Sequence, residues 1–123
     1  MWLVLGDNET SVATLRTAVR NFIRERSWEK YHNPKNVAES ICIEGAELLQ
    51  LFQWTTLEQS EELKRDKEKM RKIKEELSDV VIYCLSMANS IDIDLSDSVL
   101  EKLELDKQKY PADLYEGKAH LGS

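Results

Sequence analysis

The chain has 123 residues, which is the size of one domain with a small core. Charged residues make up 33% of it, and only four Gly and two Pro are present, a composition that favours long helices over sheet or disorder. The net charge of −6 argues against a surface that binds nucleic acid, because such a surface needs basic side chains to replace the counterions of the phosphates.

The sequence indicates neither a membrane-spanning segment nor an oxidising compartment. No apolar run approaches the roughly 18 residues that a membrane span needs. The two cysteines, Cys42 and Cys84, lack the spacing of metal ligands, and two such thiols are typical of a reducing compartment. We therefore expect a cytoplasmic protein.

The first predicted helix covers residues 12–26. Its apolar residues recur every three or four positions, at Val12, Leu15, Val19, Phe22 and Ile23, and Thr10 or Ser11 can serve as the N-cap. Pro34 then interrupts the helical pattern in a connection that is rich in aromatic residues. Two interpretations of that connection remain open: a hydrophobic lid, or a grip on a planar ligand made by Trp28, Tyr31 and His32.

A second helix is predicted over residues 36–54, with Asn36 as its N-cap. Its apolar stripe is interrupted by Glu44, a residue type that is almost never buried unpaired. Glu47 follows one turn later, and two like charges at this spacing destabilise an isolated helix. The pair therefore requires an explanation.

The next long helix repeats this acidic spacing with Glu76 and Asp79. Its apolar pattern begins at Met70, and we interpret the run of mixed charge over residues 58–76 as a solvated helical face or a mobile loop-helix connection. Between Leu77 and Ala88 the helix is apolar on all sides, so it must be covered all round. A bundle of four small helices cannot easily do this, and we expect an obligate homo-oligomer.

A fourth helix is capped by Asp92 or Asp94 and ends at Pro111, with Asp106 inside its apolar stripe. Residues 112–123 lose the periodicity and are expected to form a partly disordered tail. The fold class predicted from these elements is all-α: a four-helix bundle that forms one domain over residues 1–111.

Four converging carboxylates repel one another, so a compensating interaction is needed to hold them close. Two unit charges about 5 Å apart repel by roughly 3 kcal/mol at an effective dielectric of 20. A cation removes that cost, and Mg²⁺ suits a site made only of oxygens, with Mn²⁺ as a possible substitute. The two histidines, His32 and His120, lie outside the acid-bearing helices. The alternative is that Glu44 and Glu47 pair with Lys or Arg side chains.

These residues resemble a known family, the MazG-like all-α nucleoside triphosphate pyrophosphohydrolases, and especially its dCTP pyrophosphatase branch. The resemblance covers about residues 15–111. It is carried by E-x-x-E at Glu44 and Glu47, by E-x-x-D at Glu76 and Asp79, and by FQW at residues 52–54. The segments RSWEKYHNPKN, EELSDVVIYCL and KLELDKQKYP are also similar to the corresponding segments of the family.

The resemblance implies hydrolysis of a (deoxy)nucleoside triphosphate, with dCTP favoured, to the monophosphate and pyrophosphate. It implies that Mg²⁺ is held by the four acids, that Glu47 orients the attacking water, and that the protein is a homotetramer. The substrate would be bound by residues in three regions: Trp28 and His32 in the connection, Trp54 and Tyr83 on the acid-bearing helices, and Lys102, Asp106 and Lys109 on the last helix.

Two positions depart from the family pattern. Ile43 stands where many members have an additional Glu, which leaves the general base open, and Asp106 stands where the family often has Asn. An acid at position 106 could bind a further cation or weaken the contact with the triphosphate. The rival interpretation is a helical dimerisation module without catalytic activity, whose acids are only solvated or paired.

Overall fold

The computed structural model describes residues 5–118, which form helices and turns with no β-strand among them. This confirms the all-α fold class. In chain order the elements are α1 (Val12–Glu25), the 3₁₀ turn η1 (Glu29–Tyr31), α2 (Pro34–Gln50), α3 (Leu57–Glu62), the 3₁₀ turn η2 (Leu63–Arg65), α4 (Lys67–Ile91), α5 (Leu95–Lys109) and α6 (Ala112–Tyr115). They divide into two compact units, one up to Asp92 and one from Ile93 onward.

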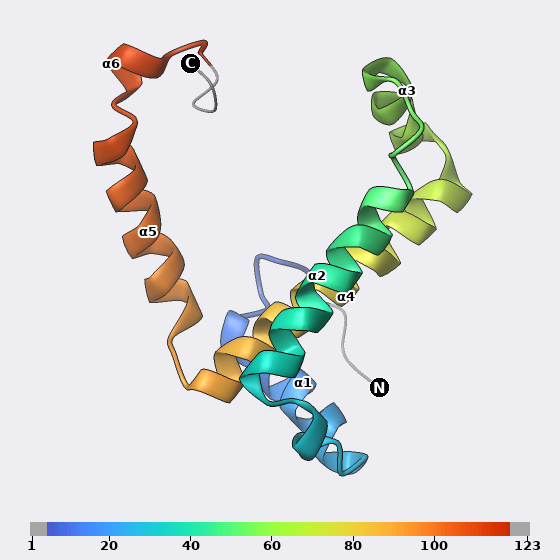
Figure 1. The fold of residues 1–123 in the computed structure, drawn as a ribbon, viewed down its shortest axis with the longest axis vertical. Coiled ribbons are helices and arrows are strands. Elements are labelled where there is room, and N and C mark those ends of the chain that lie inside the picture. The colour runs from blue at the N-terminus through green and yellow to red at the C-terminus, as the bar shows by residue number, and fades with distance from the viewer. Residues whose placement is uncertain (1–4, 119–123) are drawn as a thin grey trace. The chain divides into compact units, whose positions relative to one another are not determined.

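The first unit is built around an antiparallel pair of helices, α2 and α4. Figure 1 shows these two helices side by side, with α3 and η2 connecting them at one end. The apolar stripes that the sequence predicts meet in this pair, where Val37 of α2 and Ala88 of α4 are each only 1% exposed. The pairing brings the acidic positions of the two helices to the same level.

Helix α1 packs on the C-terminal half of α4 through apolar and polar contacts. Val19 and Ile23 are buried on its inner face. Asn89 of α4 accepts from the guanidinium groups of Arg16 and Arg20 at 2.9 and 3.0 Å, and its amide donates to the carbonyl oxygen of Arg16 at 3.1 Å. These hydrogen bonds hold the register of α1 along α4.

Helix α2 begins earlier than the sequence predicted. Its N-cap is Asn33 and not Asn36, because the Asn33 side chain accepts from the backbone N–H of Asn36 at 3.0 Å. Pro34 occupies the first helical position, where its missing N–H costs nothing and its fixed φ is already helical. Pro34, which the sequence pattern placed inside the connection, therefore starts the helix.

Many large apolar side chains of the single chain remain exposed. Within residues 5–118, the buried hydrophobic residues are Val19, Ile23, Val37, Leu63, Leu85 and Ala88. Leu77, Val81 and Ile82, in the part of α4 that is apolar all round, keep between 41% and 50% of their surface. An exposed apolar surface of this extent is more often an interaction face than a surface that stays in contact with water.

The second unit consists of α5 and α6. Asp94 caps α5 by accepting from the N–H of Asp97 at 2.9 Å, and Tyr110 is its C-cap. The Tyr110 and Tyr115 rings meet edge to face with centroids 5.3 Å apart. The loss of periodicity after Pro111 did not predict α6, and residues 119–123 of the expected tail lie outside the described range.

Because α5 belongs to this second unit, the four-helix bundle stays a prediction. None of the helices in residues 5–118 is long and apolar enough to cross a membrane.

Candidate functional site

Three carboxylates from α2 and α4 converge in the first unit. Glu44 and Glu47 lie one turn apart on α2, and Glu76 faces them from α4. One carboxylate oxygen of each lies within 4.8 Å of the others. The antiparallel pairing of the two helices therefore brings together acids that are separated by about thirty residues in the sequence.

Desolvation and mutual repulsion raise the pKa values in this cluster. Burial raises the pKa of Glu44 to about 7, with further contributions from a hydrogen bond with Glu47 and from the charges of Glu47, Asp79 and Glu76. Burial and the charges of Glu47 and Asp79 also raise the pKa of Glu76. The carboxylates of this cluster therefore disfavour carrying their full negative charge together.

The acids fit a hard divalent cation. Glu44 Oε2 and Glu76 Oε2 are both buried, and neither has a hydrogen-bond partner in the described part of the chain. A buried carboxylate oxygen without a hydrogen-bond donor lowers the stability of the fold. Several such oxygens close together supply the all-oxygen ligand set that Mg²⁺ prefers. Of the predicted ligands, Glu44, Glu47 and Glu76 form the close cluster.

Asp79 lies one turn after Glu76 on α4, at the edge of this cluster. Its charge raises the pKa of both Glu44 and Glu76, so it is electrostatically part of the same site. Its side chain also lines the neighbouring groove. It therefore links the acidic cluster to the groove.

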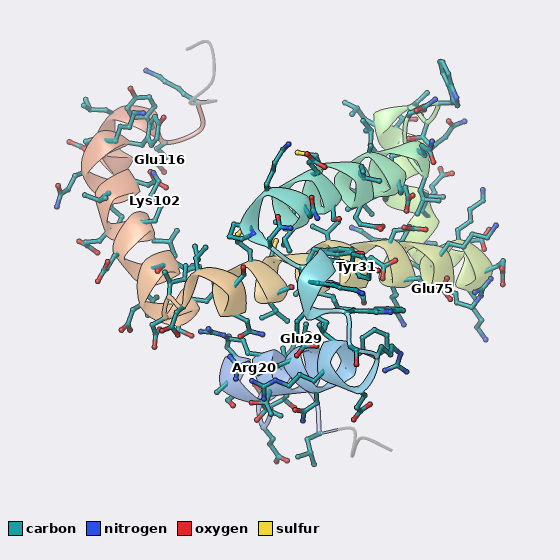
Figure 2. The ribbon with its side chains drawn as sticks, turned by 60° about the horizontal axis from the view of Figure 1, so that its bottom comes forward. Arg20, Glu29, Tyr31, Glu75, Lys102 and Glu116 are labelled. Carbon is teal, nitrogen blue, oxygen red and sulfur yellow. The ribbon has the colours of Figure 1, made fainter. Side chains whose placement is uncertain are left out.

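Basic partners do not explain the cluster. None of the ion pairs found within residues 5–118 involves Glu44, Glu47, Glu76 or Asp79. By contrast, Glu75 lies on the solvent side of α4 (Figure 2) and pairs with Arg71 at 2.7 Å. The alternative in which Glu44 and Glu47 are held by Lys or Arg is thus not what the structure shows.

A groove of about 810 Å³ runs between α1 and α4 and reaches Asp79. Phe22 and Val19 line it from α1, and Tyr83 and Leu85 line it from α4. Trp28 and His32 of the aromatic connection close one side. The groove is mostly apolar with a few polar groups, which is the usual character of a site for a small organic ligand.

His32 is held against α4 by two contacts inside this groove. Its ring lies nearly parallel to that of Tyr83, with an interplanar angle of 11° and centroids 6.1 Å apart. Its Nδ1 lies 3.2 Å from the hydroxyl of Ser86, a buried residue one turn beyond Tyr83. The connection that carries His32 and Tyr31 follows α1 directly (Figure 2).

The two predicted tryptophans have different surroundings. Trp28 lines the groove and meets Phe22 edge to face, with ring centroids 5.9 Å apart. Trp54, in the turn after α2, is 87% exposed and is not part of the groove wall. Of these two tryptophans, Trp28 is the one that lines the groove of its own chain.

The remaining predicted residues, Lys102, Asp106 and Lys109, lie on α5 in the second unit (Figure 2 labels Lys102). Lys102 forms an ion pair with Asp106 one turn on. The Lys109 ammonium lies 5.4 Å from the centre of the Tyr110 ring. The Asp106 carboxylate thus has a cationic partner on its own helix.

Sequence reasoning missed Ser86 and the part that Phe22 takes in the groove. Tyr83 follows Asp79 by four residues, and Ser86 follows Tyr83 by three. This helical spacing places all three on one face of α4. That spacing could have identified Ser86. Phe22 was assigned to the core stripe of the first helix, and nothing in the sequence distinguishes a groove wall from a core.

Comparisons with known proteins found one family model and several similar proteins. The model of the MazG-like family matches residues 39–119. The dCTP pyrophosphatase 1 of Rattus norvegicus is 35% identical over 112 residues, covering 90% of this chain and 65% of the relative. That of Homo sapiens is 34% identical over 106 residues, covering 86% and 62%. The chain thus spans somewhat under two thirds of these curated relatives.

A solved structure is similar over nearly its whole length. The crystal structure of a pyrophosphatase from Archaeoglobus fulgidus matches with a TM-score of 0.74 and 39% sequence identity. The match covers 87% of this chain and 98% of the other.

Proposed function

The chain belongs to the MazG-like family, and from this premise we propose that it hydrolyses (deoxy)nucleoside triphosphates, preferentially dCTP, to the monophosphate and pyrophosphate. The names of its relatives support this proposal: dCTP pyrophosphatase 1 in two mammals and a pyrophosphatase in an archaeon. The observation that carries it is the cluster of Glu44, Glu47 and Glu76 with its two unpartnered buried oxygens.

Glu44, Glu47, Glu76 and Asp79 would hold the cation, proposed to be Mg²⁺. When bound, Mg²⁺ neutralises charge on the phosphates and lowers the pKa of a water ligand. Glu47 orients the attacking water and accepts its proton, since Ile43 offers no carboxylate where many family members have one. The attack falls on the α-phosphorus, and pyrophosphate leaves.

The groove would hold the nucleoside. Its volume of about 810 Å³ lies in the range of small-molecule sites. Asp79 belongs both to the groove wall and to the acidic environment, which supports a pose in which a nucleoside in the groove would have its phosphates near the acids. Trp28, His32 and Tyr83 then offer aromatic faces to the sugar and base. Lys102, Asp106 and Lys109 remain proposed substrate-binding residues on the ground of the family resemblance, with Lys102 and Asp106 paired on their own helix.

A homo-oligomer, with a dimer of dimers favoured, would complete the site. The exposed apolar face of α4 at Leu77, Val81 and Ile82 supports this, because a second chain can cover it. Trp54, at 87% exposure, would enter the groove of a partner chain and not its own. The active site would then be composite.

The exposed apolar face also favours a second candidate function, a dimerisation module without catalysis. An assay of dNTP hydrolysis with Mg²⁺ and with excess chelator separates the two. The enzyme turns over only with Mg²⁺, Glu76→Gln is inactive, and Glu75→Gln, which changes a solvent-facing neighbour, retains activity. A module yields no product under any of these conditions.

A further inference from the structure

The hydroxyl group of Ser86 makes one hydrogen-bond contact among the described residues. It is 3% exposed, and it lies in the interior of α4, where backbone carbonyl oxygens are already bonded within the helix. A buried serine in a helix commonly donates back to the carbonyl four residues earlier. Here the one hydrogen-bond contact of its side chain in the described part of the protein is with Nδ1 of His32, at 3.2 Å.

This contact determines which nitrogen of His32 carries the proton. A buried hydroxyl hydrogen without an acceptor costs about 1 to 3 kcal/mol, so the Ser86 hydroxyl donates to the acceptor within its reach. With the hydroxyl as the donor of this 3.2 Å contact, Nδ1 is the acceptor and is unprotonated. The hydrogen of the neutral ring then lies on Nε2, which becomes a donor.

The Tyr83 ring fixes the plane of the same imidazole. The two rings are within 11° of parallel, and Tyr83 lies one turn before Ser86 on the same face of α4. Ser86 sets the rotation of the ring within that plane, since Nδ1 is tied to the helix. Both the position and the tautomer of His32 thus come from α4.

His32 and Ser86 together form a wall between two cavities. One is the large groove, and the other is a polar cavity of about 200 Å³ that also includes Arg20 and Asn89. Nε2 of His32 makes no hydrogen bond with the described residues. Because His32 lines both cavities, its second nitrogen can serve a ligand bound beside it.

We propose that Ser86 is a specificity-determining positioning residue: its hydroxyl holds His32 as the Nε2–H tautomer, whose donor binds an acceptor on the edge of the substrate base. This rests on the proposed function for the identity of the ligand. Both bases present O2 as an acceptor, but N3 is an acceptor in cytosine and carries a hydrogen in thymine. A donor fixed opposite N3 therefore favours dCTP over dTTP, because a site built around that hydrogen bond rejects the analogue that cannot accept it.

The first test is the tautomer of His32 in the full chain. The chain has two histidines, so His120→Gln leaves one imidazole to observe. With ¹⁵N-labelled histidine at about pH 9, where imidazoles are neutral, the ring nitrogen shifts report the tautomer directly. We expect Nε2–H alone in the protein with Ser86, and a mixture of both tautomers in Ser86→Ala. A proton on Nδ1 in the presence of Ser86 overturns the proposal.

The second test is kinetic and uses matched hydroxyl variants. Ser86→Ala should raise the KM for dCTP roughly three- to tenfold with kcat changed less than twofold, and the dCTP to dTTP ratio of kcat/KM should fall by a similar factor, as loss of one hydrogen bond predicts. Ser86→Thr, which keeps the hydroxyl, should restore the ratio. Ser90→Ala removes an exposed hydroxyl one turn away, outside the groove, and should leave both constants unchanged.

An unchanged ratio in Ser86→Ala, together with the expected change of tautomer, overturns the role in specificity. Failure of the proposed function would look different. In that case the unmodified protein hydrolyses no dNTP, while the nitrogen shifts still report the contact of Ser86 with His32.

Discussion

The carboxylates of Glu44 on α2 and Glu76 on α4 face one another, and each has one buried oxygen without a hydrogen-bond partner in the described part of the chain. This arrangement is unfavourable for a protein that only needs to fold, because it combines desolvation with like-charge repulsion. It is favourable once a divalent cation shares those oxygens. The predictions on metal and pH start from this pair.

Removing one ligand charge should abolish turnover without unfolding the protein. We predict that Glu47→Gln and Asp79→Asn each lose dCTP hydrolysis and retain their helical circular dichroism, because amides keep the shape of the side chain but not its charge. Glu75→Gln is the matched control, since Glu75 pairs with Arg71 on the outer side of α4. A Glu47→Gln variant with unchanged turnover would show that Glu47 is neither ligand nor base.

Metal binding should stabilise the fold. A ligand at one hundred times its Kd adds about 2.7 kcal/mol to the free energy of unfolding, so saturating Mg²⁺ should raise Tm by several degrees. Glu44→Gln should reduce this rise. Equal Tm values with Mg²⁺ and with chelator, measured by calorimetry, would contradict the assignment of the cluster as a metal site.

The stability of the metal-free protein should depend on pH through the same acids. The folded pKa of Glu44 is about 7, raised from 4.5, so between these values the folded state binds more protons than the unfolded state. The free energy of unfolding should therefore fall as pH rises from about 4.5 to about 7, and Glu76 acts in the same direction.

This pH effect is measured from the difference in Tm at about pH 5 and pH 8 in chelator. Glu44→Gln should make the difference smaller, because it removes the group that gains protons on folding. A Tm difference that is the same in both proteins would exclude Glu44 as its source.

The effect of Trp54→Ala on dCTP binding should depend on oligomer formation, whereas the effect of Trp28→Ala should not. Stacking of a base on an aromatic ring contributes about 1 to 3 kcal/mol, so Trp28→Ala should raise the KM for dCTP about tenfold to a hundredfold. Trp54 is 87% exposed in the single chain, so any effect of Trp54→Ala requires a partner subunit. Light scattering alongside the kinetics checks this. A protein that is a monomer at micromolar concentration and still loses dCTP affinity in Trp54→Ala would contradict the composite site.

The pattern of the sequence predicted the helices well and their ends less well. Helical periodicity identified α1, α2, α4 and α5, because burial of one face requires it. The start of α2 was misplaced because Pro34 is compatible with both a turn and a first helical position. The short helix α6, at residues 112–115, is stabilised by the ring contact of Tyr110 with Tyr115, which no periodicity reveals.

The acids of the site could be found from sequence, but their partners could not. E-x-x-E and E-x-x-D mark Glu44 and Glu76 because acids inside apolar stripes are rare. That His32 would rest on Tyr83 and Ser86, fifty or more residues away, depends on how the connection folds over α4. Only the three-dimensional packing decides that.

The central claim is that the acidic cluster cleaves a nucleoside triphosphate between its α and β phosphates. The most direct measurement is a ³¹P NMR time course of dCTP with the full chain and Mg²⁺. The account predicts that the three triphosphate resonances give way to those of dCMP and pyrophosphate in equal amounts, and that Glu76→Gln produces neither. Appearance of dCDP and inorganic phosphate, or persistence of intact dCTP, would contradict it.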